Sequence, residues 1–135
     1  MEENIKIVID TSVVLAKIMP DEIEGKDVDE IFLKHAKNEV LFIAPKILPF
    51  EVANALKSAC KSKRLDSKLA FELYQNFVGL KVEYKDIDLS KTINLALNEN
   101  LSIYDAVYLQ LGIENKCKLL TLDKQLKVVF DKITL

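Results

Sequence analysis

Short apolar runs alternate with longer stretches of helical spacing along most of the chain. The runs are rich in Ile, Val and Leu, which is typical of β-strands buried in a sheet. They lie at residues 5–9, 40–44, 80–84, 118–122 and 132–135.

The stretches between these runs carry apolar residues three and four positions apart, which predicts amphipathic helices. One of them, residues 46–63, contains Pro49. A helix tolerates proline in its first turn because the early N–H groups have no partner there. The other stripes are Val28, Ile31, Phe32 and His35; Leu69, Ala70, Leu73 and Phe77; and Leu89, Ile93, Ala96 and Leu97.

Strands that alternate with helices predict an α/β domain, in which helices cover both faces of a parallel sheet. The chain of 135 residues suffices for one such domain, and Gly, Pro and Ser nowhere cluster into a linker. We therefore interpret residues 1–135 as a single domain. In such sheets a ligand binds beyond the carboxyl ends of the strands, where the strand order reverses.

Composition favours a protein of the cytoplasm. The N-terminal sequence MEENIKIVID carries acids and a short apolar run, so we interpret it as neither a signal peptide nor a membrane span. Cys60 and Cys117 lie far apart, which favours two buried thiols in a reducing compartment over a disulfide. The net charge of −2 disfavours binding of nucleic acid by bulk attraction, although clustered acids would mask a basic surface in that sum.

Four acidic residues stand near the ends of predicted elements. Asp10 follows the first strand and Asp123 follows the fourth. Glu51 begins the helix after the second strand, and Asp105 lies in the first turn of the helix before the fourth. Each also has a purely structural interpretation. Asp is a favoured N-cap worth about 1 kcal/mol, SIYD at 102–105 fits a capping box, and Glu51 would complement its helix dipole.

Taken together, the four acids suggest metal chemistry. If they converge, their repulsion raises some carboxyl pKa values unless a cation neutralises them. Carboxylate oxygens suit Mg²⁺ or Mn²⁺ better than zinc. No Cys/His cluster offers a zinc site, and three glycines cannot build a Walker loop or a dinucleotide fingerprint. The single histidine, His35, lies on an apolar stripe, and we interpret it as a packing residue.

Two hydroxyls accompany these acids. Ser12 stands two residues after Asp10, and Thr121 stands two residues before Asp123. Both are therefore expected at the same edge of the sheet.

One face of the helix over 46–63 carries further polar residues. Asn54 stands three residues after Glu51, which places it on the same face. Basic residues continue along this face, and they form either a track for phosphates or an ordinary solvated helix face. They are Lys57, Lys61 and Arg64.

Four segments form a recognisable series: VIDTSVV at 8–14, PFEVANAL at 49–56, SIYDAVYLQLG at 102–112 and LLTLDKQL at 119–126. In order and separation the series resembles a PIN-domain ribonuclease, and within that family the toxin of VapBC-type toxin–antitoxin pairs. IDTS alone is a weak signal, whereas the whole series is specific and spans nearly the whole chain. The resemblance implies a PIN-like α/β/α sandwich with a central parallel sheet of four to five strands flanked by helices.

Carried over by position, the resemblance also implies a catalytic site for Mg²⁺ or Mn²⁺. Ser12 and Thr121 match positions whose hydroxyls orient water or metal, and Asn54 matches a polar position beside the glutamate. The chain would then be an endoribonuclease that leaves a 5′-phosphate and a 3′-hydroxyl. The family further implies a homodimer and a small antitoxin partner. The implied metal ligands are Asp10, Glu51, Asp105 and Asp123.

Three other interpretations remain. A response-regulator receiver needs a phosphoacceptor Asp at the end of a central strand, and the third run here ends in Tyr84 and Lys85 with Asp86 beyond. An aspartyl-nucleophile phosphatase needs a second acid where Ser12 stands. A non-catalytic PIN-like module that binds RNA or protein would leave the carboxylates repelling one another without use.

Overall fold

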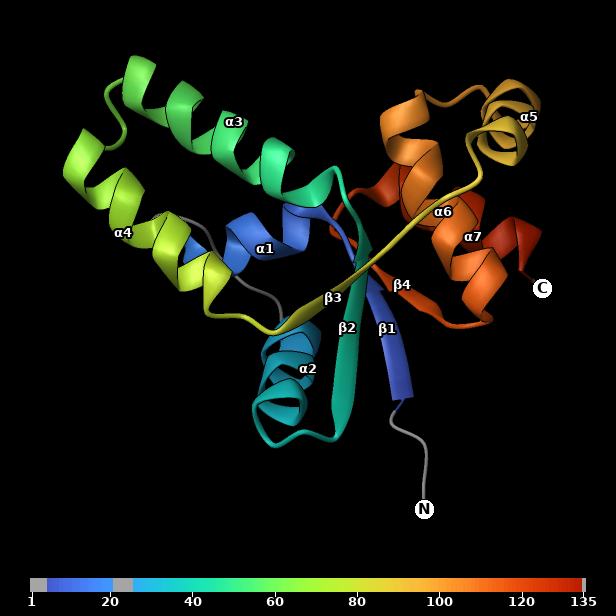
Figure 1. Cartoon of the computed structure of the whole chain (residues 1–135), viewed down its shortest axis with the longest axis horizontal. Coiled ribbons are helices and arrows are strands. Elements are labelled where there is room, and N and C mark those ends of the chain that lie inside the picture. Colours follow the sequence, from blue (N-terminus) through green and yellow to red (C-terminus); the bar gives the residue numbers. More distant parts are fainter. Residues whose placement is uncertain (1–4, 21–25, 135) are drawn as a thin grey trace.

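A four-stranded parallel sheet forms the centre of the computed structural model, which describes residues 5–20 and 26–134. The strands are β1 (Ile5–Ile9), β2 (Val40–Pro45), β3 (Val82–Lys85) and β4 (Lys118–Leu120). Their order across the sheet is β3-β2-β1-β4 (Figure 1). Ile7 pairs in register with Phe42 of β2 on one side and with Lys118 of β4 on the other. The strand order therefore reverses between β1 and β4.

Helices cover both faces of the sheet. They are α1 (Thr11–Ile18), α2 (Lys26–Ala36), α3 (Leu48–Lys61), α4 (Ser67–Val78), α5 (Leu89–Glu99), α6 (Ile103–Asn115) and α7 (Lys124–Ile133). The steps from β1 to β2 to β3 run one way across the sheet, and the return to β4 runs the other way. Right-handed crossovers then put the helices of the two directions on opposite faces. Figure 1 shows α1, α2 and α4 on one side and α5, α6 and α7 on the other, which confirms the expected α/β/α sandwich.

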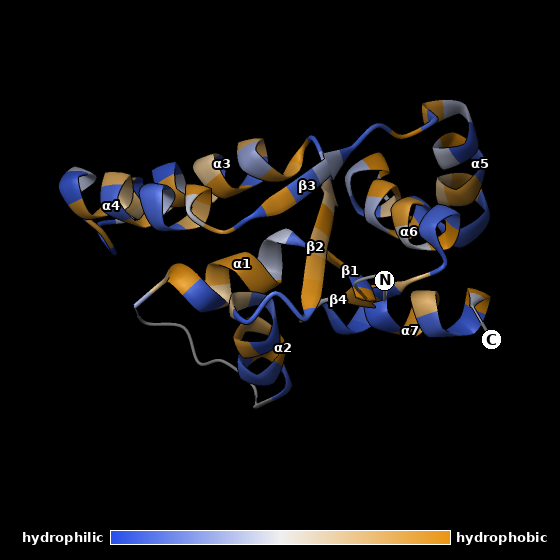
Figure 2. Ribbon diagram, turned by 60° about the horizontal axis from the view of Figure 1, so that its bottom comes forward, coloured by the Kyte–Doolittle hydropathy of each residue, from blue (hydrophilic) through white to orange (hydrophobic). Residues whose placement is uncertain are grey.

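The interior is apolar along the central strands and α6. Val8 of β1 and Phe42 and Ile43 of β2 are fully buried, and Figure 2 shows β2 as hydrophobic along most of its length. Helix α6 packs against β1, β2 and β4 and buries Leu109 completely. Burial of such a side chain stabilises the fold by about 1.5–3 kcal/mol. The helix that carries Asp105 is therefore held firmly on the sheet.

Four of the five predicted strands are confirmed, with shifts at their ends. The first spans residues 5–9 as predicted, and the second extends one residue further, to Pro45. The third begins at Val82 rather than at residue 80, and the fourth ends at Leu120 rather than at residue 122. The early end of β4 has a local cause. The Thr121 hydroxyl accepts a hydrogen bond from the N–H of Asp123 at 3.0 Å, so the chain turns there.

The fifth predicted strand, 132–135, is wrong. Lys132 and Ile133 belong to α7, Thr134 caps the end of that helix, and Leu135 lies outside the described residues. A four-residue apolar run does not distinguish a strand from the end of a helix. The longer helical spacing of the segment is the better signal: it comprises Leu126, Val129, Phe130 and Ile133.

The four predicted helical stretches all lie in helices. The stretch over 46–63 is α3, with Pro49 in its first turn. On α5 the buried side chains are Thr92 and Ala96, while Leu89 and Ile93 of the predicted stripe are at least half exposed. In the described part of the chain, no helix has the length and apolar character needed to cross a membrane.

Two smaller expectations have different outcomes. The His35 ring stacks on Phe42 with centroids 4.0 Å apart and hydrogen-bonds to the Lys81 carbonyl at 2.8 Å, which confirms its packing role. Cys60 and Cys117 are free thiols, but both are only partly buried. The prediction of two buried thiols was therefore wrong, because Cys60 lies in the last turn of α3 and Cys117 in the short connection between α6 and β4, where fewer side chains cover them.

Gly112 of α6 tests how closely α7 packs on α6. A Cβ atom at this buried position would lie 3.0 Å from Phe130 Cε2. We expect Gly112→Val to lower the free energy of unfolding by about 1–3 kcal/mol, since the added methyl groups force the ring aside. Urea denaturation measures this. Gly79→Ala, at an exposed position with no contact under 3.4 Å, is the control and should change stability little. Equal stability of both variants would contradict the packing.

Candidate functional site

Asp10 lies at the carboxyl end of β1 and is 5% exposed. Its Oδ1 accepts hydrogen bonds from the Ser12 hydroxyl at 2.6 Å and from the Val13 N–H at 3.2 Å, the latter as N-cap of α1. Its Oδ2 accepts a hydrogen bond from the Thr121 hydroxyl. A buried carboxylate is costly unless it is hydrogen-bonded in this way. Three donors from two parts of the chain therefore hold it in place.

Ser12 and Thr121 join the ends of β1 and β4, as their spacing predicts. The Ser12 hydroxyl donates to Asp10 and accepts from the Leu122 N–H at 2.9 Å. The Thr121 hydroxyl donates to Asp10 and accepts from the Asp123 N–H. This junction lies where the strand order reverses, which is the expected location of a ligand site in an α/β sheet.

The negative charge of Asp123 helps to raise the pKa of two other carboxyl groups, those of Asp10 and Asp105. Burial is the main cause that raises the pKa of Asp10; the hydrogen bonds from Ser12, Thr121 and Val13 oppose the rise, and the charge of Asp123 adds to it. The pKa of Asp105 is raised as well, first by burial and then by Asp123, against a hydrogen bond with Ser102. Asp10, Asp105 and Asp123 therefore share one electrostatic neighbourhood although they come from separate elements.

The predicted helix caps are also present. Asp123 Oδ1 accepts from the Leu126 N–H at 3.1 Å, and the Ser102 hydroxyl accepts from the Asp105 N–H at 3.1 Å. Capping does not exclude ligand binding, because the two oxygens of a carboxylate together offer more lone pairs than the hydrogen bonds of a cap use. The structural and the functional interpretations of Asp10 and Asp123 are therefore compatible.

Glu51 is held by two hydroxyls that the sequence analysis did not identify. Its Oε1 accepts from Tyr108 at 2.5 Å and from Thr11 at 2.9 Å. Burial raises the pKa of Tyr108 far above its ordinary value, and the hydrogen bond to Glu51 raises it further, so the hydroxyl remains a donor. The charge of Asp10 also contributes to this rise, which places Asp10 and Glu51 in reach of the same phenol. Thr11 directly after Asp10, and Tyr108 one turn after Asp105, were the available signals.

The oxygen ligands of these acidic residues suit a hard divalent cation, but the carboxylates do not converge on one point. Within residues 5–20 and 26–134, no three His, Cys, Asp or Glu side chains stand close enough together to hold a metal ion. Burial is the main cause that raises the pKa of Asp10 and Asp105, and repulsion from Asp123 adds to it; a cation would stabilise both carboxylates against these effects. Asp105 is partly exposed and Asp123 exposed, so both side chains have room to turn toward an ion. Carboxylate oxygens are the ligands that Mg²⁺ and Mn²⁺ prefer.

The polar face of α3 is only partly as predicted. Asn54, Lys57 and Lys61 are exposed on the helix that begins beside the acids. Arg64 does not continue this face, because α3 ends at Lys61 and the chain turns through Lys63 with a positive φ of 64°. The face therefore runs about 15 Å from Glu51 to Lys61, at 1.5 Å per residue.

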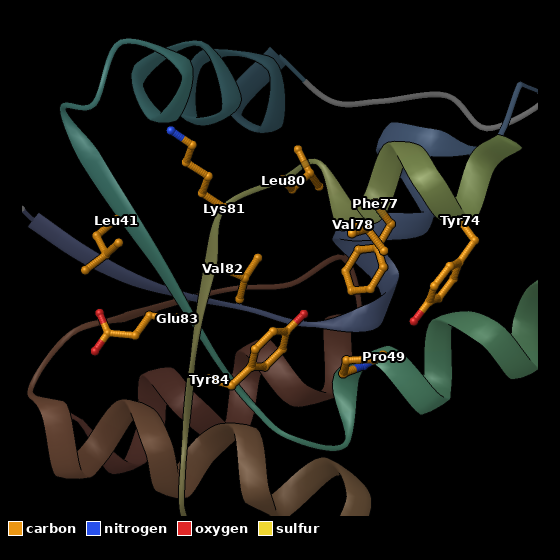
Figure 3. A pocket seen from close by; sticks show the side chains of 10 residues that line it. All are labelled: Leu41, Pro49, Tyr74, Phe77, Val78, Leu80, Lys81, Val82, Glu83 and Tyr84. Carbon is orange, nitrogen blue, oxygen red and sulfur yellow. The ribbon is translucent and has the colours of Figure 1, made fainter.

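None of the four acids lines the groove between α4 and β3, which has a volume of 610 Å³. Figure 3 shows Tyr74 and Phe77 of α4 across from Tyr84 of β3. Asp86, the residue that a receiver would use, follows the edge strand β3 and pairs with Lys46 at 2.7 Å on the surface. Neither the groove nor the surroundings of Asp86 combine a buried carboxylate with hydroxyl donors, as the β1–β4 junction does.

The raised pKa of Asp105 makes a prediction about stability. A carboxyl whose pKa is higher in the folded protein favours folding when protonated and opposes it when ionised. In EDTA at pH 7, Asp105→Asn should therefore unfold at a higher urea concentration than the natural protein. The gain should shrink as the pH falls toward the unfolded value of about 3.9. Asp131→Asn, which breaks only a surface pair with Lys127, is the control. An Asp105→Asn variant that is less stable at pH 7 would contradict this account.

Comparisons with known proteins agree with this arrangement. Residues 7–131 match the PIN domain family. Ribonuclease VapC3 of Pyrobaculum aerophilum is 31% identical over 129 residues, which cover 93% of this chain and 95% of that protein. The crystal structure of PAE2754 from Pyrobaculum aerophilum superposes with a TM-score of 0.70 at 16% identity, over 96% of this chain and 95% of that one. The chain therefore belongs to the PIN domain family, with a VapC ribonuclease among its relatives.

Proposed function

We propose that this chain is a Mg²⁺- or Mn²⁺-dependent endoribonuclease and the toxin of a type II toxin–antitoxin pair. Membership of the PIN domain family and the ribonuclease relative support this proposal. The observation that carries it is Asp10, a buried carboxylate held by three donors where the strand order reverses, with Asp123 beside it. A site of this kind concentrates negative charge that only a cation or a proton neutralises.

Asp10, Asp105, Asp123 and Glu51 would hold the metal. When bound, the ion supplies Lewis acidity and a water of lowered pKa for attack on a phosphodiester. Ser12 and Thr121 keep the Asp10 carboxylate in one orientation, since they bond its two oxygens separately. A rigid carboxylate loses little entropy on binding its ligand, which is what a precise site requires.

The substrate would approach along α3. Asn54 lies about one turn from Glu51, and Lys57 and Lys61 continue at one-turn steps on exposed helix. Ammonium groups at such intervals attract phosphates without reading sequence. Arg64 follows in the turn beyond the helix, off this face, and we propose it only as a further contact for phosphates.

The similarity to ribonuclease VapC3 also supports proposals about the location, assembly and regulation of this chain. We propose that residues 1–135 form one catalytic domain that works in the cytoplasm as a homodimer. A small cognate antitoxin would hold it inactive until RNA cleavage is required.

Asp10→Asn tests the catalytic assignment. The variant should cleave RNA at least about 100-fold more slowly in Mg²⁺, because metal catalysis contributes several kcal/mol and each 1.36 kcal/mol is tenfold in rate. Gel analysis of a labelled single-stranded RNA gives the rate and shows whether products carry a 5′-phosphate. Asp131→Asn, an acid on the surface of α7, is the control. Full cleavage by Asp10→Asn, or undiminished cleavage by the natural protein in EDTA, would contradict the proposal.

Expression in a bacterial host tests the role as a toxin. Induction of the natural chain without its partner should arrest growth, whereas Asp105→Asn should be tolerated at the same protein level. Colony counts after induction, with immunoblots to match the amounts, measure the difference. Equal growth with the two proteins would separate any nuclease activity from toxicity and overturn the toxin assignment.

A further inference from the structure

Three side chains from three helices meet at Glu51. The Glu51 carboxylate comes from α3, the Thr11 hydroxyl from α1 and the Tyr108 hydroxyl from α6. Both hydroxyls donate to the same oxygen, Oε1, at 2.9 Å and 2.5 Å, and they lie 3.2 Å from each other. The positions are 40, 57 and 97 residues apart in the chain. The cluster therefore forms only when the helices on both faces of the sheet are in place.

The geometry restricts a side chain that is otherwise flexible. Fixing a glutamate side chain costs rotamer entropy, and hydrogen bonds to its charged carboxylate offset that cost. In the described part of the chain both bonds end on Oε1 and none ends on Oε2. One oxygen of Glu51 is thus anchored while the other keeps its lone pairs for a ligand.

Tyr108 also connects Glu51 to the other acids. It is 2% exposed and lies three residues after Asp105, on the same face of α6. A shift of α6 would therefore move Asp105 and the anchor of Glu51 together. This arrangement gives a fixed relation between one acid of α3 and one acid of α6, which a shared ligand requires.

We propose that Tyr108, assisted by Thr11, is a positioning residue that orients Glu51 for the ligand of the acidic site. The inference rests on the proposed function, because the ligand is the divalent cation of that proposal. A tyrosine that only fills the core would give the same burial, but it would not require a hydroxyl directed at Glu51. The hydroxyl is therefore the group to remove.

Tyr108→Phe removes the hydroxyl and keeps the ring. Calorimetric titration with Mn²⁺, without RNA, should show binding weakened by about 10-fold or more, the usual effect of losing a group that orients a ligand. With RNA and saturating Mn²⁺, kcat should fall while KM changes little. Thr11→Val should weaken Mn²⁺ binding in the same direction and serves as the second variant if Tyr108→Phe folds poorly. Tyr74→Phe, on α4 away from the acids, is the matched control and should bind Mn²⁺ as the natural protein does.

Glu51→Gln separates positioning from simple packing. If Tyr108 acts through Glu51, adding Tyr108→Phe to Glu51→Gln should weaken Mn²⁺ binding no further, whereas independent effects would add. Unchanged Mn²⁺ affinity in Tyr108→Phe, or additive effects in the double variant, would overturn the inference while the proposed function stands. Absence of Mn²⁺ binding and of RNA cleavage in the natural protein would overturn both.

Discussion

The hydrogen bonds to Asp10 are the interaction on which the rest of the site depends. A carboxylate with 5% exposure persists only where donors replace the water it has lost. Those donors come from the residues that follow β1 and from Thr121 after β4. The Thr121 hydroxyl also accepts a hydrogen bond from the Asp123 N–H, which ends β4 early and turns the chain toward α7. One buried charge thus joins the central strand β1 to the edge strand β4 at the carboxyl end of the sheet, where chemistry is expected.

The topology explains why acids so distant in sequence meet. Strand order β3-β2-β1-β4 puts the ends of the first and last strands side by side, although Ile9 and its partner Leu120 are 111 positions apart in the chain. Helix α3 packs with α1 and α4, on the face opposite to α6, so Glu51 and Asp105 approach the carboxyl edge of the sheet from both sides (Figure 1). The sheet order thus sets which acids approach one another, and side-chain contacts such as that of Tyr108 with Glu51 then fix the finer geometry.

Much of this was accessible from the sequence because it depends on local pattern. The apolar runs located β1 and β2 to within a residue, and the caps at Asp10, Ser102 and Asp123 followed from residue type and position. The misread end of α7 shows the limit of a four-residue window. Tyr108 was missed for another reason. In the run YDAVYLQ it resembles any buried aromatic, and its partner Glu51 lies 57 residues away. Arg64 was misplaced because the left-handed turn at Lys63 has no strong sequence signal.

The central claim is that carboxylates from separate elements serve one divalent ion. As they stand, no three such side chains in the described residues are close enough to hold it, so binding requires Asp105 and Asp123 to turn inward. Crystals grown with Mn²⁺ and measured for anomalous scattering test this directly. The account predicts a Mn²⁺ peak bound by Asp10 together with Asp105 or Asp123. Well-ordered crystals in saturating Mn²⁺ with no peak at Asp10, or with manganese bound only elsewhere, would contradict it.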